Sequence, residues 1–180
     1  DPMTYSEPIA VLAGTPVDTQ MGVDLLHAAG LTALACPLSE NPRQQNLFQI
    51  SSAAEKHAFV LNILNEAMQS SCRRALVYCN SLSSSVDFTA LAEETGMQIV
   101  TPLQVYRSLP ARYHRLGIIA ANAPGLSGIE QTLYHEDPSL ELLSVSLLPL
   151  VLAIETAARP EALVQQYHLH DLAAWFQNCG

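Results

Sequence analysis

The chain has 180 residues, which is the length of one ordinary domain or of two small ones. Hydrophobic residues make up 49% of it and charged residues 14%, a composition typical of folded proteins and not of disordered ones. Seventeen acidic and 8 basic residues give a net charge of -9. Because so acidic a surface repels the phosphate backbone, we do not expect the protein to bind nucleic acid.

The sequence also argues against a membrane span and a metal site. Its longest uninterrupted apolar run, 147–154, is far shorter than the ~20 residues that a membrane helix needs. The first residues carry no secretory pattern. The four cysteines, Cys36, Cys72, Cys79 and Cys179, contain neither a Cys-x-x-Cys pair nor a zinc spacing. We therefore expect a cytoplasmic protein with free thiols, without a metal and without a membrane partner.

Short apolar runs alternate with amphipathic stretches, which is typical of α/β folds with mainly parallel sheets. Most of the runs are continuously apolar, as expected for strands that are covered on both faces. The expected strands are Ile9–Ala13, Thr32–Cys36, Ala75–Cys79, Gln98–Val100, Leu116–Ala121 and Glu141–Leu147.

Helices are expected between these strands, and the whole is expected to form two α/β lobes, residues 1–102 and 103–180. Ser52-x-x-Glu55 is a capping box that begins a helix over 52–71. A similar signal, Ser84-x-x-Asp87, predicts a helix that ends near Gly96, and Pro160 fits the first turn of a last helix over 160–178. The apolar stripe expected for the helix over 52–71 consists of Ala54, Ala58, Leu61, Leu64 and Met68.

The strongest group of reactive side chains follows the third expected strand, where Cys79, Asn80 and Ser81 lead into a helix. Open α/β sheets bind ligands at the carboxyl ends of their strands, and a nearby helix N-terminus favours negative charge. Cys79 is therefore a candidate catalytic thiol, and its two neighbours are candidates for holding a carboxylate. The alternative is a cysteine that only packs at the end of a buried strand.

Polar loops follow other strands at the same predicted edge of the sheets. The loop after the first strand contains neither the Gly-Lys-Ser/Thr of a phosphate loop nor the dinucleotide fingerprint. Cys36 ends the second strand, and the burial preference of free cysteine favours a core position for it. The candidate polar residues of these loops are Gly14, Thr15, Ser39, Asn41 and Asn122.

In their order and spacing these motifs resemble the cofactor-independent aspartate/glutamate racemase superfamily. The resemblance rests on the Gly-bearing loop after the first strand, on Cys79-Asn80-Ser81, and on the segments Leu116–Gly128 and 144–150. It implies two similar flavodoxin-like lobes with the active site between them. It also implies an isomerase that racemises or epimerises a small amino-acid substrate by cysteine-mediated α-proton transfer, without pyridoxal phosphate or another cofactor.

The resemblance assigns the catalytic role to Cys79. A homodimer is compatible with it. The only lysine, Lys56, lies inside an expected helix and away from any strand end, which is a poor position for a Schiff base. The residues that the resemblance implies for substrate binding are Gly14, Thr15, Ser39, Asn41, Asn80, Ser81 and Asn122.

The family's second cysteine stands in a Gly-Cys-Thr-His-like motif on a further strand, and these 180 residues do not contain that motif. The second lobe is therefore expected to lack its last portion, and Cys179 is interpreted as structural or incidental. Two alternatives stay open. One is a single-cysteine relative of the maleate isomerase or arylmalonate decarboxylase type, and the other is a non-catalytic small-molecule binder that has kept the cleft.

Overall fold

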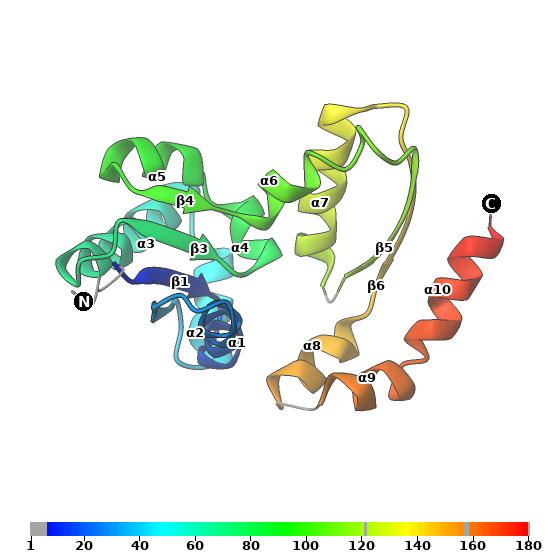
Figure 1. Cartoon of the computed structure of the whole chain (residues 1–180), viewed down its shortest axis with the longest axis horizontal. Helices are drawn as coiled ribbons and strands as arrows, with labels where there is room; N and C mark the ends of the chain where they lie inside the picture. Colours follow the sequence, from blue (N-terminus) through cyan, green and yellow to red (C-terminus); the bar gives the residue numbers. More distant parts are fainter. Residues whose placement is uncertain (1–6, 121, 157–158, 180) are drawn as a thin grey trace. The chain divides into compact units, whose positions relative to one another are not determined.

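The computed structural model describes residues 7–120, 122–156 and 159–179, the side chains of Pro42 and Glu155 aside. These residues form two compact units, the first reaching to Gln104 and the second starting at Val105. Each unit contains a sheet whose strands all pair in parallel (Figure 1). The predicted α/β class with mainly parallel sheets is thus confirmed.

The first unit is built on a four-stranded sheet with the order β2-β1-β3-β4. The third expected strand ends two residues early, so that Tyr78 and Cys79 follow it instead of belonging to it. The other strands lie within one residue of their expected ends at either side. The strands of this sheet are β1 (Ile9–Ala13), β2 (Ala33–Pro37), β3 (Arg74–Val77) and β4 (Gln98–Val100).

All five residues of β1 are buried because helices cover both faces of the sheet. On one face Val11 packs against α1 (Pro16–Ala28), where a Cβ added to Gly22 would lie 2.7 Å from Val11 Cγ1. On the other face Ala10 and Leu12 join a core that includes α3 (Ala53–Gln69) and α5 (Phe88–Thr95). This two-sided burial explains why the strand is continuously apolar and does not alternate.

The helix starts of the first unit confirm one capping prediction and correct another. At α3, Ser52 Oγ accepts from Glu55 N–H and the Glu55 carboxylate accepts from Ser52 N–H, which is the predicted capping box. The predicted start at Ser84 is wrong, because Ser84 lies inside a short helix, α4 (Asn80–Ser85). Buried Val86 then adopts an extended backbone, and Asp87 caps α5 by accepting from Ala90 N–H. The remaining helices of this unit are α2 (Pro42–Ile50) and α6 (Pro102–Tyr106), the latter spanning the boundary to the second unit.

The apolar stripe expected on α3 is only partly correct. Leu64 is fully buried, but Ala54 and Ala58 are exposed, and the buried face consists of Val60, Leu64 and Ala67. Leu61 and Met68 of the expected stripe are partly buried and pack against the same core. Phe59, which also belongs to α3, stays exposed.

The second unit holds a two-stranded sheet of β5 (Arg115–Ala120) and β6 (Glu141–Ser146). Helix α7 (Ala123–Glu136) covers one face through a small core formed with Leu116 and Ile118. On the other face Phe176 lies so close to Gly117 that an added Cβ would clash with its ring. Glycine at this position therefore allows a helix near the chain's end to approach the sheet.

The expected last helix over 160–178 is in fact two helices, α9 (Pro160–Gln166) and α10 (Leu169–Asn178). His168, with a φ of 50°, adopts the left-handed conformation between them, which no continuous helix permits. The apolar run before them forms α8 (Leu148–Glu155), which has 8 residues. Throughout the described ranges no helix has the length and apolar character required to cross a membrane.

The close contact between Gly22 and β1 generates a stability prediction. Replacing Gly22 by alanine adds helix propensity but forces a methyl group against Val11 and Tyr78. We expect Gly22→Ala to lower the free energy of unfolding by about 1–3 kcal/mol, as overpacking does elsewhere. Urea unfolding followed by circular dichroism measures this, with Met21→Ala on the exposed side of α1 as the control. A more stable Gly22→Ala protein would mean that α1 and β1 do not pack in this way.

Candidate active site

Parallel pairing brings three loops of the first unit to one edge of its sheet. Ala13 pairs with Pro37, and Leu12 with Val77, so that β1, β2 and β3 end side by side. The ladder continues one residue further, since Leu38 N–H donates to the Ala13 carbonyl (3.0 Å) and Tyr78 N–H to the Leu12 carbonyl (2.7 Å). This edge is where open α/β sheets bind ligands.

The predicted residues of the first unit lie along this edge. Ser39 is buried, and its hydroxyl donates to the carbonyl of Gly14, which ties the loop after β2 to the loop after β1. Cys79, Asn80 and Ser81 follow β3 at the same edge and are half-buried. Asn122 belongs to the second unit, where it begins α7 after β5. The residues at the edge of the first sheet are Gly14, Thr15, Ser39, Asn41, Cys79, Asn80 and Ser81.

Cys79 stands at the N-cap of α4 with an extended backbone. Its carbonyl accepts from Ser83 N–H (3.1 Å) and from the Ser83 hydroxyl (2.6 Å), which fixes the start of the helix. Its Sγ lies 3.3 Å from Ser81 Oγ. The hydroxyl can therefore donate to a thiolate or accept from a thiol. Cys79 itself is partly buried.

Three of the predicted binding side chains serve as helix caps. Thr15 Oγ1 accepts from Asp18 N–H at α1, Asn41 Oδ1 from Gln44 N–H at α2, and Asn122 Oδ1 from Gly125 N–H at α7. Each residue stands directly before a helix, where threonine and asparagine are favoured N-caps. The sequence thus contained a signal for this structural role, which the assignment to substrate binding passed over.

The remaining described cysteines lie in different surroundings. Cys36 packs against the core of the first unit, in agreement with the sequence-based expectation, and burial raises its pKa to about 11, with Cys72 and Glu66 adding to the rise. Cys72 is fully buried, and burial raises the pKa of its thiol as well. Cys179 is exposed at the end of α10. Cys36 is thus a poor candidate for a second proton-transferring group at neutral pH.

The raised pKa of Cys36 makes a test of thiol reactivity informative. At pH 8 a thiol with a pKa of about 11 is roughly 0.1% thiolate, so its alkylation is slow. We expect iodoacetamide at pH 8 to leave Cys36 and Cys72 unmodified in the folded protein and to modify exposed Cys179. Peptide mass mapping measures the order, with the urea-unfolded chain as the control in which all thiols react. Early modification of Cys36 would contradict its packing in the core.

Two cavities of notable size lie elsewhere in the described structure. One, of about 720 Å³, runs between α2 and α3 of the first unit and reaches Ser39. The other, of about 510 Å³, lies between the outer face of β5–β6 and α10 and is lined in part by Gly117 and Phe176. Cys79 lines neither cavity. The sequence reading missed the first of them, although the apolar residues of α2 and α3 that do not fit the buried stripe were a signal.

The described residues also bear on metal and Schiff-base chemistry. Within the ranges that the structure describes, no cluster of three or more His, Cys, Asp or Glu residues could hold a metal ion. Lys56 lies in the first turn of α3 with its Nζ 5.9 Å from the centre of the Phe48 ring. Its ammonium group thus lies over an aromatic ring of α2.

No protein-family model and no curated protein sequence matches the chain. Solved structures of glutamate racemases do match it in fold. For the enzyme of Bacillus anthracis (isoform RacE1) the TM-score is 0.62 with 17% identity, over 89% of this chain and 62% of that one. For the enzyme of Francisella tularensis in complex with D-glutamate the TM-score is 0.57 with 14% identity, over 77% of this chain and 52% of that one. For the enzyme of Campylobacter jejuni the TM-score is 0.57 with 11% identity, over 88% of this chain and 66% of that one.

These likenesses define the class of structure. The chain has the two-lobe α/β fold of the glutamate racemases, which confirms at the level of fold the resemblance found in the sequence. It spans between 52% and 66% of the length of these three structures. At 11% to 17% identity the likeness extends to the fold alone.

Proposed function

We propose that the protein is an amino-acid racemase or epimerase that works without a cofactor, with Cys79 as a proton-transferring thiol. The observation that carries the proposal is the position of Cys79-Asn80-Ser81 one residue after the end of β3, in a chain with the fold of the glutamate racemases. One of those structures contains D-glutamate, which supports an acidic or small polar amino acid as the substrate. The proposed setting is the cytoplasm.

The chemistry proposed for Cys79 is the removal and return of an α-proton. Its thiolate takes the proton from the substrate Cα, and the electron pair of the broken C–H bond moves toward the substrate carboxylate. Backbone N–H groups at the sheet edge and the side chains of Asn80 and Ser81 would stabilise the negative charge that develops there. The protonated thiol then returns a proton to the same carbon, so that no cofactor is consumed.

A single thiol serves one face of the substrate, so inversion would need a second base on the opposite face. Cys36 lies in the core with its pKa raised to about 11, which argues against it as the base for the opposite face. The 180 residues alone are therefore proposed to exchange the α-proton with retention, and inversion would require a second base from elsewhere. A single-cysteine relative of the isomerase or decarboxylase type, or a binder without activity, is the alternative function.

Proton exchange in D₂O tests the role of Cys79. We expect the α-proton of one enantiomer of glutamate or aspartate to be replaced by deuterium, as followed by ¹H NMR. Because a serine hydroxyl is a far weaker base, Cys79→Ser should slow this exchange by about 10²-fold or more. Cys179→Ser changes an exposed thiol at the end of α10 and should leave the rate unchanged.

Three outcomes would count against the proposal. Exchange at the original rate in Cys79→Ser would remove Cys79 from the mechanism. Loss of exchange on treatment with EDTA would indicate a metal-dependent reaction. Binding of an amino acid without any exchange, in the protein with intact Cys79, would favour the non-catalytic binder.

A further inference from the structure

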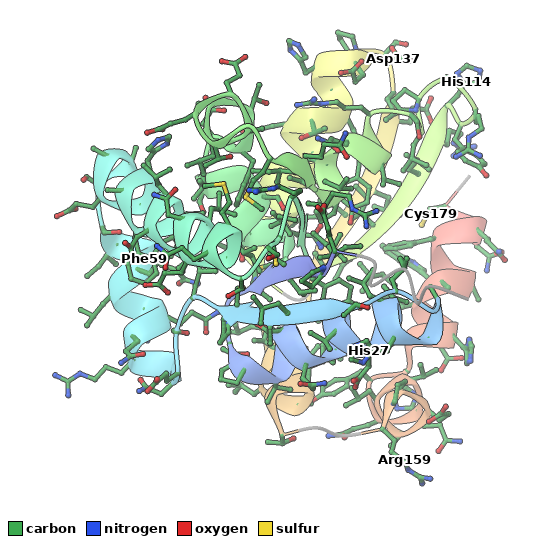
Figure 2. The ribbon with its side chains drawn as sticks, turned by 60° about the vertical axis from the view of Figure 1, so that its left-hand side comes forward. His27, Phe59, His114, Asp137, Arg159 and Cys179 are labelled. Atoms are coloured by element: carbon green, nitrogen blue, oxygen red, sulfur yellow. The ribbon has the colours of Figure 1, made fainter. Side chains whose placement is uncertain are left out.

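The cavity between α2 and α3 is an elongated groove with a floor that belongs to the core. Leu38, Phe48 and Ile63 line it and pack in or against the core of the first unit. Its walls include Leu47 of α2 and Phe59 of α3, which are 57% and 45% exposed. Phe59 (labelled in Figure 2) contacts α2 through Phe48, with 5.6 Å between the ring centres. The groove thus has apolar side chains on its floor and in its walls, and it opens to the surface.

Both helices present one continuous face to this groove. On α3 the lining residues follow helical spacing from Glu55 to Glu66, and on α2 they do so from Gln44 to Phe48. Glu55 and Glu66 are 11 positions apart on this helix, which corresponds to about 16 Å along the axis. The occupant that such a groove fits is long and narrow, on the scale of three helical turns.

The rim of the groove is acidic. Glu40, Glu55 and Glu66 all line it and are exposed, and they outnumber the one ammonium group beside it, Lys56 Nζ, which lies 5.9 Å from the centre of the Phe48 ring. Hydrogen bonds with Ser52 lower the pKa of Glu55, which keeps that carboxylate charged. A second copy of this chain, whose net charge is -9, is poorly suited to this rim. A cationic partner is favoured by charge complementarity.

We propose that the α2–α3 groove binds a basic amphipathic helix of a partner protein. The apolar face of that helix would lie on Phe48 and Ile63 between the walls formed by Leu47 and Phe59. Its basic residues, about 11 positions apart, would pair with Glu55 and Glu66 at the two ends of the groove. Helix-in-groove binding of this kind uses apolar anchors at helical spacing, with charges at the rim setting orientation.

A model peptide tests the proposal independently of catalysis. The probe is a fluorescein-labelled helical peptide with leucines on one face and a lysine near each end, about 11 residues apart. Its matched control peptide has the same composition with the lysines moved into the leucine face. Fluorescence anisotropy on the whole chain gives the affinities, and we expect the first peptide to bind at least about tenfold more tightly.

Matched protein variants locate the binding surface. Leu47→Asp should weaken binding by about tenfold, whereas Leu25→Asp, on α1 and 54% exposed, should change it less than about twofold. Likewise Glu66→Lys should weaken binding more than Glu93→Lys, which makes the same charge change at an exposed position of α5. These side chains are exposed, so circular dichroism should report an unchanged fold, and the Glu66 pair provides the test if Leu47→Asp does not fold.

Several results would overturn the proposal. Equal effects of Leu47→Asp and Leu25→Asp, or equal binding of the two peptides, would show that only the net charge attracts the probe. A dimer in sedimentation that Leu47→Asp dissociates would assign the groove to a second copy of the chain. Complete displacement of the peptide by millimolar benzylamine would assign it to a small organic cation.

Discussion

The in-register pairing of β1 between β2 and β3 is the interaction on which the rest of the first unit depends. Ile9 to Ala13 pair with β2 and Ile9 to Leu12 with β3, and their side chains are buried against α1 on one face and against α3 and α5 on the other. Because the three strands run parallel and end together, the residues that follow them meet at one edge. The candidate site is a consequence of this pairing, since its residues come from loops more than 20 positions apart in the chain.

At that edge, some of the positions proposed to bind substrate are also positions that stabilise helices. Thr15 and Asn41 cap α1 and α2, and Ser39 ties two loops together through the Gly14 carbonyl. Their polar groups thus hold the edge in shape, while Cys79 and Ser81 place a sulfur and a hydroxyl 3.3 Å apart beside it. A half-buried thiol held at the start of a helix fits the proton transfer proposed for Cys79, since the base must be held within reach of its proton.

The first unit combines this edge with a second surface of different character. The α2–α3 groove shares Ser39 with the edge, but its walls are apolar and its rim is acidic. It exists because α3 has more large apolar residues than one helical stripe can bury against the sheet. Val60, Leu64 and Ala67 occupy the buried stripe, which leaves Phe59 outside the core.

Local signals in the sequence determined the elements that depend on neighbouring residues. The apolar runs located the six strands, Ser52 and Glu55 located the start of α3, and the residues after β3 located the thiol at a strand end. Only the tertiary structure decided which residues are buried, because burial depends on residues distant in the chain. It left Ala54 and Ala58 of the predicted α3 stripe exposed and buried Val60 and Ala67 beside Leu64. It also surrounded Cys36 with groups that raise its pKa and broke the last helix at His168. It also opened the α2–α3 groove, since the gap between two helices is set by how each packs on the sheet and not by either sequence alone.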